Sequence, residues 1–284
     1  RTFDIIDYGA ELSRYPLVIL PDSVPLSVDA AARLREYLRT GGAVLASGRS
    51  ATAPGGDRFL LPELGVELLG EAEHCPRYAR IGGDGFPTIP PMDYVFYERG
   101  TRVRALPGTE VLAPVVDPYF DRSWERFSSH RQTPPATATA EPFVTRAGRS
   151  VYVASPVFRD YALNGNQVFR QIVERALELV GPPPLVRADL PALAELTVRS
   201  TGTDLVLHVL SYVVQRRCRT MDIVEDRFPL LGRRFAVRCA RRPRGVRLVP
   251  DGEAVSFDWR EPYAEFRVPR IEGHGMIVME GGAA

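Results

Sequence analysis

The first fifty residues alternate between apolar runs and one amphipathic segment. Residues 16–20 (PLVIL) form an uninterrupted apolar run, which is typical of a strand buried on both faces. Ser27 is a predicted N-cap for a helix whose apolar positions recur with helical spacing: Ala30, Leu34, Tyr37 and Leu38. Gly41-Gly42 ends that helix, and residues 43–46 (AVLA) form a second apolar strand. Strand, helix and strand in this order predict one right-handed crossover of a parallel sheet.

Similar patterns return after residue 149. Residues 150–154 (SVYVA) have the buried-strand pattern, and a helix is predicted from about Asn166 to Val180. Ten prolines interrupt residues 71–145, so no helix is expected there, and short apolar stretches predict a separate β-rich insertion over about residues 65–148. Residues 3–7 (FDIID) are strand-like but too close to the next strand for a helix between them. We therefore expect either a fragment of a longer protein or a different pairing of this segment.

A boundary is predicted at residues 181–184 (GPPP). Beyond residue 190, short strand candidates recur about every ten residues with glycine turns between them. Several alternate polar and apolar residues, as in residues 234–238 (RFAVR), which predicts an antiparallel β-sandwich with one solvated face per sheet. The expected domains are therefore residues 1–184, an α/β domain with the insertion, and residues 185–284, the sandwich.

Composition narrows the classes of partner. The net charge of +1 over 284 residues favours neither nucleic acid nor an anionic membrane, and no apolar run is long enough to cross a membrane. Cys75, Cys218 and Cys239 are too widely spaced for a zinc site or a disulfide scaffold, although one bridge stays open. The glycines of residues 82–85 precede no helix and so form no phosphate-binding loop. We expect no metal, no cofactor and a cytoplasmic location.

Two candidate catalytic arrangements receive little support from the residues. Ser47 lies on a strand-to-helix turn, but it lacks the G-x-S-x-G frame and a suitably placed histidine, so a capping role in the turn is expected instead. Asp121 and Glu125 are close in sequence, yet nothing indicates that they flank one bond as glycosidase carboxylates must. The sequence therefore predicts no catalytic residue.

The densest cluster of aromatic and polar residues covers residues 117–135. Aromatic rings beside carboxylates, histidine and arginine are typical of saccharide sites, where a sugar face stacks on a ring. The candidate substrate-binding residues are Trp124, His130 and Asp121 in this cluster, with Arg49 on the turn after the second strand. The alternative is that Tyr119, Phe120, Trp124 and Phe127 form the small core of the insertion.

Two further features have ordinary explanations. Residues 216–247 contain many arginines, and alternating strands place such residues on a solvated face or in ion pairs between domains. His208 falls within an apolar strand and His274 follows a glycine turn. We expect both histidines to be structural and not ligands.

Several stretches resemble known families. "YLRTGG" and "AVLASGRS" within residues 15–50 are similar to the trimerisation domain of the β-galactosidases of glycoside hydrolase family 42. That domain has an open parallel sheet like class I glutamine amidotransferases (flavodoxin-like) and follows a catalytic (β/α)8 barrel. "SHRQTPP" and "ASPVFRDYALNGNQVFRQIVERAL" resemble later parts of the domain, most of all in bacterial hypothetical glycosyl hydrolases described as α-fucosidase-like. "LVLHVLSYV" and "VPRIEGHGMIVME" resemble their C-terminal β-sandwich.

The resemblance implies a non-catalytic oligomerisation and accessory region of a glycoside hydrolase, with the barrel on polypeptide outside this sequence. It also implies a homotrimer and a saccharide as partners. Two alternatives stay open: a free-standing amidotransferase-like hydrolase, and a carbohydrate-binding module.

Overall fold

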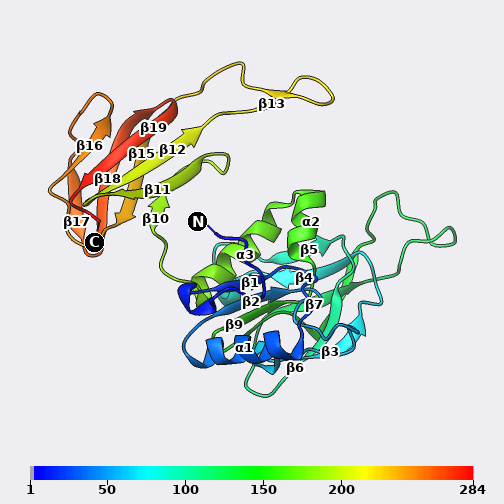
Figure 1. Cartoon of the computed structure of the whole chain (residues 1–284). Helices are drawn as coiled ribbons and strands as arrows, with labels where there is room; N and C mark the ends of the chain where they lie inside the picture. The colour runs from blue at the N-terminus through cyan, green and yellow to red at the C-terminus, as the bar shows by residue number, and fades with distance from the viewer. Residues whose placement is uncertain (1–2, 284) are drawn as a thin grey trace. The chain divides into compact units, whose positions relative to one another are not determined.

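A computed structural model describes residues 3–283, which form two compact units. Ile6–Pro182 make up the N-terminal unit, and the C-terminal unit begins at Pro183. Both units are drawn in Figure 1. The N-terminal unit has two apolar cores and the C-terminal unit has one.

The N-terminal unit is built mainly from strands, with three α-helices. Its helices are α1 (Val28–Arg39), α2 (Val157–Asn164) and α3 (Gln167–Val180). Its strands are β1 (Val18–Leu20), β2 (Val44–Ser47), β3 (Val66–Glu71), β4 (Arg77–Ile81), β5 (Met92–Phe96), β6 (Thr101–Ala105), β7 (Glu110–Pro118), β8 (Pro135–Ala147) and β9 (Ser150–Val153). Short 3-10 turns lie at Leu12–Arg14, Pro62–Leu64 and Gly83–Gly85.

One mixed sheet of seven strands organises this unit, in the order β1-β2-β9-β8-β7-β4-β5. Only β1, β2 and β9 run parallel, and the other four strands are antiparallel. The prediction of an open parallel sheet is therefore right for one half of the sheet alone. The predicted insertion is not a separate lobe either, because β4, β5, β7 and β8 extend the same sheet. Only β3 and β6 pair outside it.

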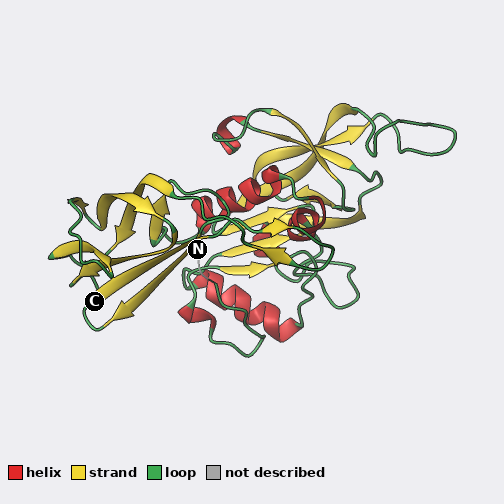
Figure 2. Cartoon of the chain, turned by 90° about the horizontal axis from the view of Figure 1, so that it is seen from above, coloured by secondary structure: helices red, strands yellow, loops and turns green. Residues whose placement is uncertain are grey.

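The parallel half has helices on both faces (Figure 2). Ala31, Leu34 and Tyr37 of α1 pack with Val44 and Ala46, and α3 covers the opposite face of the same strands. Side chains alternate between faces along a strand, so β2 supplies both cores, and all four of its residues are buried. The predicted helices are confirmed, with N-caps at Ser27 and Asn166, whereas α2 was not predicted.

Two predictions near the N-terminus are wrong. Residues 3–7 form no strand, and the side chains of Phe3 and Ile5 are exposed. Strand β1 is not buried on both faces, because Ile19 is 36% exposed. β1 is the outermost strand of the sheet, where one side lacks the cover that a central strand receives.

The C-terminal unit is an antiparallel β-sandwich. One sheet has the order β10-β15-β18-β17 and the other β11-β12-β19-β16. The strands are β10 (Val186–Ala188), β11 (Glu195–Thr201), β12 (Asp204–Ser211), β15 (Leu230–Arg238), β16 (Gly245–Val249), β17 (Phe257–Arg260), β18 (Tyr263–Ile271) and β19 (Gly273–Glu280), with a two-stranded ribbon of β13 (Gln215–Arg216) and β14 (Asp222–Ile223). Alternate residues, such as Leu207, Val237 and Ile277, fill the core between the sheets.

The helices are all short. Among residues 3–283, no helix combines the length and the apolar character that crossing a bilayer requires.

Candidate functional site

The long connection between β7 and β8 carries an open hollow of about 510 Å³. Its lining comes from three separate parts of the chain: Cys75, Pro76, Tyr97, Arg122, Ser123, Trp124, Phe127 and Arg131. Cys75 and Pro76 precede β4, and Tyr97 directly follows β5. The base of the connection is anchored, because the buried Tyr78 hydroxyl donates to Thr133 O and Thr133 Oγ1 donates to Phe120 O (2.7 Å).

Large aromatic side chains of this connection face solvent. Trp124 is 90% exposed, and Tyr119 and Phe127 are each 70% exposed. The alternative that these rings form the core of the insertion is therefore wrong. Fully covering an aromatic side chain of about 150–250 Å² contributes roughly 4–6 kcal/mol at about 25 cal/mol per Å², before the costs of association. Trp124 and Phe127 line the hollow, and exposed aromatic groups gathered in this way are typical of a binding surface.

Two guanidinium groups lie over aromatic rings of the hollow. Arg122 lies 5.1 Å from the centroid of the Phe127 ring, and Arg131 lies 4.5 Å from that of Tyr97. Such cation–π contacts leave most guanidinium N–H groups free to donate to a ligand. Arg122 uses one donor on His130 O (3.1 Å), and Arg131 uses one on Asn164 Oδ1 (2.9 Å).

The hollow is connected to helix α2 through a buried carboxylate. Asn164 Nδ2 donates to Asp160 Oδ1 (2.7 Å), and Asp160 Oδ2 accepts from the backbone N–H of Tyr97 (3.0 Å). Asp160 is fully buried, and this desolvation raises the pKa of its carboxyl despite those hydrogen bonds. Asp160 thus fixes both the backbone at Tyr97 and the side-chain amide of Asn164, which accepts from Arg131.

The four predicted substrate-binding residues do not converge. Trp124 lines the hollow. Asp121 lies at its edge, where Oδ1 accepts from Cys75 N (3.3 Å) and Oδ2 lies 3.2 Å from His74 Nδ1. His130 contributes its carbonyl to Arg122 but is not among the lining residues. Arg49 lies elsewhere, bonded to Glu71 (3.1 Å) and Gly56 O (2.7 Å).

Tyr97, Cys75 and Pro76 were missed as lining residues. They are distant in sequence from residues 117–135, and the antiparallel pairing of β4 with β5 and β7 brings them there. Tyr97 within the apolar stretch before Glu98 was visible in the sequence, but only as part of a strand. No local pattern indicates that the residue after a strand will meet a loop that comes thirty residues later.

Polar groups at the carboxyl ends of the parallel strands form a structural clamp. Ser47 is fully buried, and its hydroxyl donates to Asp22 Oδ1 (2.7 Å) and accepts from Asp22 N (2.8 Å). The Asp22 carboxylate also accepts from Phe158 N (3.3 Å) and Arg159 N (2.7 Å) in the first turn of α2. The prediction that Ser47 caps the next segment is therefore wrong. It holds the aspartate that caps a distant helix.

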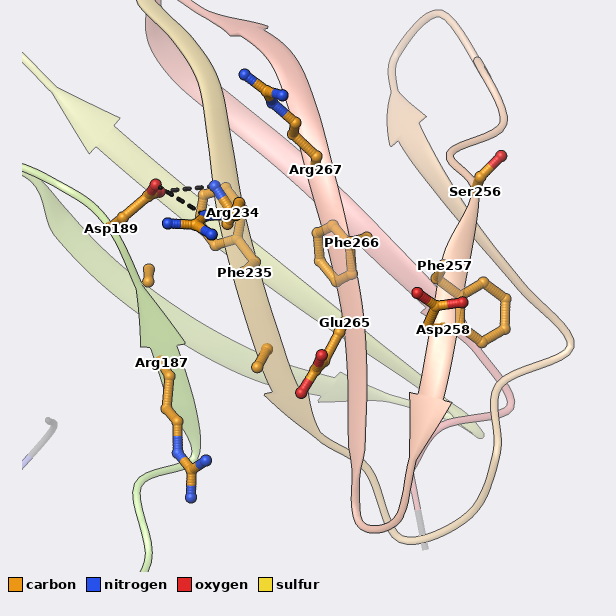
Figure 3. A pocket seen from close by; sticks show the side chains of 12 residues that line it. Arg187, Asp189, Arg234, Phe235, Ser256, Phe257, Asp258, Glu265, Phe266 and Arg267 are labelled. Atoms are coloured by element: carbon orange, nitrogen blue, oxygen red, sulfur yellow. Dashed lines mark hydrogen bonds and ion pairs between the residues drawn. The ribbon is translucent and has the colours of Figure 1, made fainter.

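A second hollow, of about 650 Å³, lies on the sheet β10-β15-β18-β17 of the C-terminal unit (Figure 3). Its charged lining comprises Arg187, Arg234 and Arg267 with Asp189, Asp258 and Glu265. These charges balance, and Asp189 accepts from the backbone N–H of Arg234 (2.6 Å), which lowers the pKa of that carboxyl. Glu265 lies 3.5 Å from Arg260. Because the positive and negative charges balance, they favour neither anionic nor cationic ligands. The hollow on the connection between β7 and β8 is therefore the stronger candidate site.

The basic region of residues 216–247 makes ion pairs within its own unit. The pairs join Arg216 with Asp222, Arg217 with Glu225, Arg227 with Glu272, Arg234 with Asp189, and Arg247 with Glu280. Over residues 3–283, no three side chains from His, Cys, Asp and Glu gather as a metal site.

Comparisons with known proteins place this architecture among glycoside hydrolases. No family model matches the chain, and neither does any curated protein. The α-L-fucosidase isoenzyme 2 of Paenibacillus thiaminolyticus superposes with a TM-score of 0.90 and 31% identity, covering 98% of this chain and 42% of the fucosidase. The chain thus spans less than half the length of that enzyme.

Two β-galactosidases share the fold at lower similarity. Gan42B of G. stearothermophilus, from family 42, has a TM-score of 0.58 and 14% identity over 96% of this chain and 33% of its own. The β-galactosidase of Rahnella sp. R3 has a TM-score of 0.58 and 15% identity, over 97% of this chain and 34% of its own. These findings support the predicted relation to glycosidases, and at this identity the β-galactosidases inform the fold alone.

Proposed function

We propose that this chain is a non-catalytic accessory region of a glycoside hydrolase. Its loop between β7 and β8 contributes an aromatic and cationic wall to a saccharide site. The observation that carries the proposal is the match of nearly the whole chain to a minor part of the fucosidase, at 31% identity and a TM-score of 0.90. An accessory region is expected to coincide with part of an enzyme and to leave the remainder for bond cleavage.

The chemistry of the hollow supports saccharide binding. The Trp124 ring offers an exposed apolar face of the kind on which a sugar ring stacks, and Arg122 and Arg131 retain donors for hydroxyl groups. L-fucose is the first sugar to test, because a structure that matches nearly the whole chain at 31% identity is named for it. Galactose is the second, from the names of the two β-galactosidases.

The polar groups at the strand ends favour an accessory role over an amidotransferase-like activity. A nucleophilic serine needs an accessible hydroxyl and a base that can take its proton. Ser47 is fully buried, and its partner Asp22 is committed to the first turn of α2. We place the catalytic carboxylates on polypeptide outside these residues and the assembly at a homotrimer, both as parts of the proposal.

Saccharide titration followed by tryptophan fluorescence tests the proposal. The chain has two tryptophans, and we expect fucose to change the signal of Trp124, with Trp259 as the internal reference. Because Trp124→Ala removes the fluorescent reporter, calorimetry measures fucose binding by the variants. Trp124→Ala should lose affinity, whereas Phe228→Ala, which removes another exposed aromatic ring, should keep the affinity of the parent. Equal sugar binding by Trp124→Ala and the parent would overturn the assignment of the hollow.

Hydrolysis assays test the non-catalytic part. The chain is expected to release no phenol from aryl α-L-fucosides or aryl β-galactosides. Turnover that persists in Trp124→Ala and disappears in Ser47→Ala would support the amidotransferase-like hydrolase instead. Sugar binding by a strict monomer would favour an isolated carbohydrate-binding module, and light scattering measures that mass.

A further inference from the structure

Two histidines meet on the outer face of the sheet β11-β12-β19-β16. His208 lies on β12 and His274 on β19, which are neighbours in this sheet (Figure 1). His208 Nδ1 is 3.1 Å from His274 Nε2. The ring planes are only 12° apart, yet the centroids are 5.4 Å apart. A centroid distance so much longer than the nitrogen distance means that the rings meet edge to edge, with the two nitrogens facing each other.

This spacing suits two ligands of one metal ion. Imidazole nitrogens bind zinc at about 2.0–2.1 Å, so two of them at square or tetrahedral angles lie roughly 2.9–3.4 Å apart. The observed 3.1 Å falls within that range. The two nitrogens face each other as in a hydrogen bond, so both rings must rotate before their lone pairs converge on one ion. His274 is exposed and His208 is only partly buried, which leaves room for these rotations.

A third donor lies beside the pair. Met276 is the residue directly opposite His208 across β12 and β19. Ile277 and Met279 point into the core, so His274 and Met276 share the outer face with His208. A thioether is a soft ligand that favours copper, and copper also binds imidazole most strongly among the divalent ions of the first row.

We propose that His208 and His274, with Met276 beside them, form a binding site for a late first-row transition-metal ion, copper above all. The remaining positions are open to water or to a substrate group. This site lies in the C-terminal unit and is independent of the saccharide site.

The charges around the pair affect its readiness to bind. Arg199 lies across from Val206 on the neighbouring strand, two residues along β12 from His208. Its charge opposes a bound cation, which gives the test a variant expected to bind more tightly.

Copper titration of the whole chain, prepared without added histidines, tests the proposal. CuCl2 is the probe, and electron paramagnetic resonance reports nitrogen ligands through hyperfine splitting while calorimetry reports affinity. The chain has four histidines, so His74→Gln and His130→Gln serve as matched controls for His208→Gln and His274→Gln. Circular dichroism verifies that each variant is folded.

We expect one Cu²⁺ per chain with a two-nitrogen spectrum. Each of His208→Gln and His274→Gln should lose about tenfold or more in affinity, since one imidazole cannot chelate, whereas the controls keep the affinity of the parent. Arg199→Gln should bind Cu²⁺ more tightly, and Met276→Leu should weaken Cu⁺ more than Cu²⁺. Parental affinity in the double variant His208→Gln/His274→Gln, or a parent without nitrogen splitting at equimolar copper, would overturn the proposal.

Discussion

The two halves of the seven-stranded sheet are held together in different ways. In the parallel half, β2 and β9 are wholly buried apolar strands covered by helices, and the polar groups lie at the strand ends. In the antiparallel half, charged side chains on β4, β7 and β8 make ion pairs across strands, and Arg102 of β6, outside this sheet, joins them through Glu141. Apolar burial and the clamp of Ser47 and Asp22 therefore stabilise the parallel half. Ion pairs between strands stabilise the antiparallel half, which also carries the connection with the hollow.

Arg77 is the centre of the antiparallel network. It is 8% exposed and donates to Asp117 Oδ1 (3.1 Å) and Glu141 Oε2 (2.8 Å). Arg77→Ala leaves Asp117 without its partner and Glu141 with Arg102 alone, and it should lower the free energy of unfolding by about 3 kcal/mol. The control is Arg80→Ala on the same strand, whose exposed pair with Asp93 should cost only about 0–1 kcal/mol. Equal losses in urea unfolding would show that the network does not stabilise this half.

The same network predicts a dependence on pH. Burial tends to raise the pKa of Glu141, but hydrogen bonds from Arg77 and Arg102 outweigh it, so the net pKa lies below the usual 4.5. A depressed pKa means that the stabilisation is present above 4.5 and is lost as the pH falls through the folded-state value. The thermal stability of the parent should fall as the pH drops below 4.5. The stability of Glu141→Gln should fall less over the same pH range. An identical slope in both proteins would contradict the assignment.

In the parallel half, Asp22→Ala should have the next largest effect. It removes the carboxylate that caps α2 and bonds Ser47, and it leaves alanine at a φ of 58°. We expect a loss of about 2–3 kcal/mol, with about 1 kcal/mol for Ser47→Ala. Asp57→Ala, at an exposed loop aspartate, is the control for the urea measurements. A Ser47→Ala loss as large as that of Asp22→Ala would show that the hydroxyl, and not the helix cap, dominates the clamp.

Asn164→Ala should have the smallest effect on stability, about 0.5–1.5 kcal/mol for two lost hydrogen bonds at a partly exposed position. Its main consequence is expected at the hollow, because Arg131 loses the amide that holds it beside Tyr97. Fucose affinity should fall while folding is retained, as measured by fluorescence titration. Gln167→Ala, at the exposed first residue of α3, is the control. Unchanged fucose affinity in Asn164→Ala would show that α2 does not support ligand binding at the hollow.

Local sequence patterns identified the parallel half and the sandwich strands well. The run at residues 43–46 is buried on both faces, and the caps at Ser27 and Asn166 lie where the helices begin. The strands of the antiparallel half were harder to predict, because β7 and β8 contain Pro114, Pro118 and Pro142. Those prolines fall at irregularities in the β7–β8 register, where a missing N–H does not interrupt the ladder.

The sequence by itself determined the crossover of strands and helix, the sandwich and the aromatic cluster of residues 117–135, because each depends on the spacing of nearby residues. Only the tertiary structure decided that the strands after residue 71 join the same sheet and that Asp22 caps a helix 136 residues away. It likewise decided which residues line the hollow and that His208 meets His274. These contacts depend on strand order and register, which pair residues distant in the chain and leave no periodicity in the sequence.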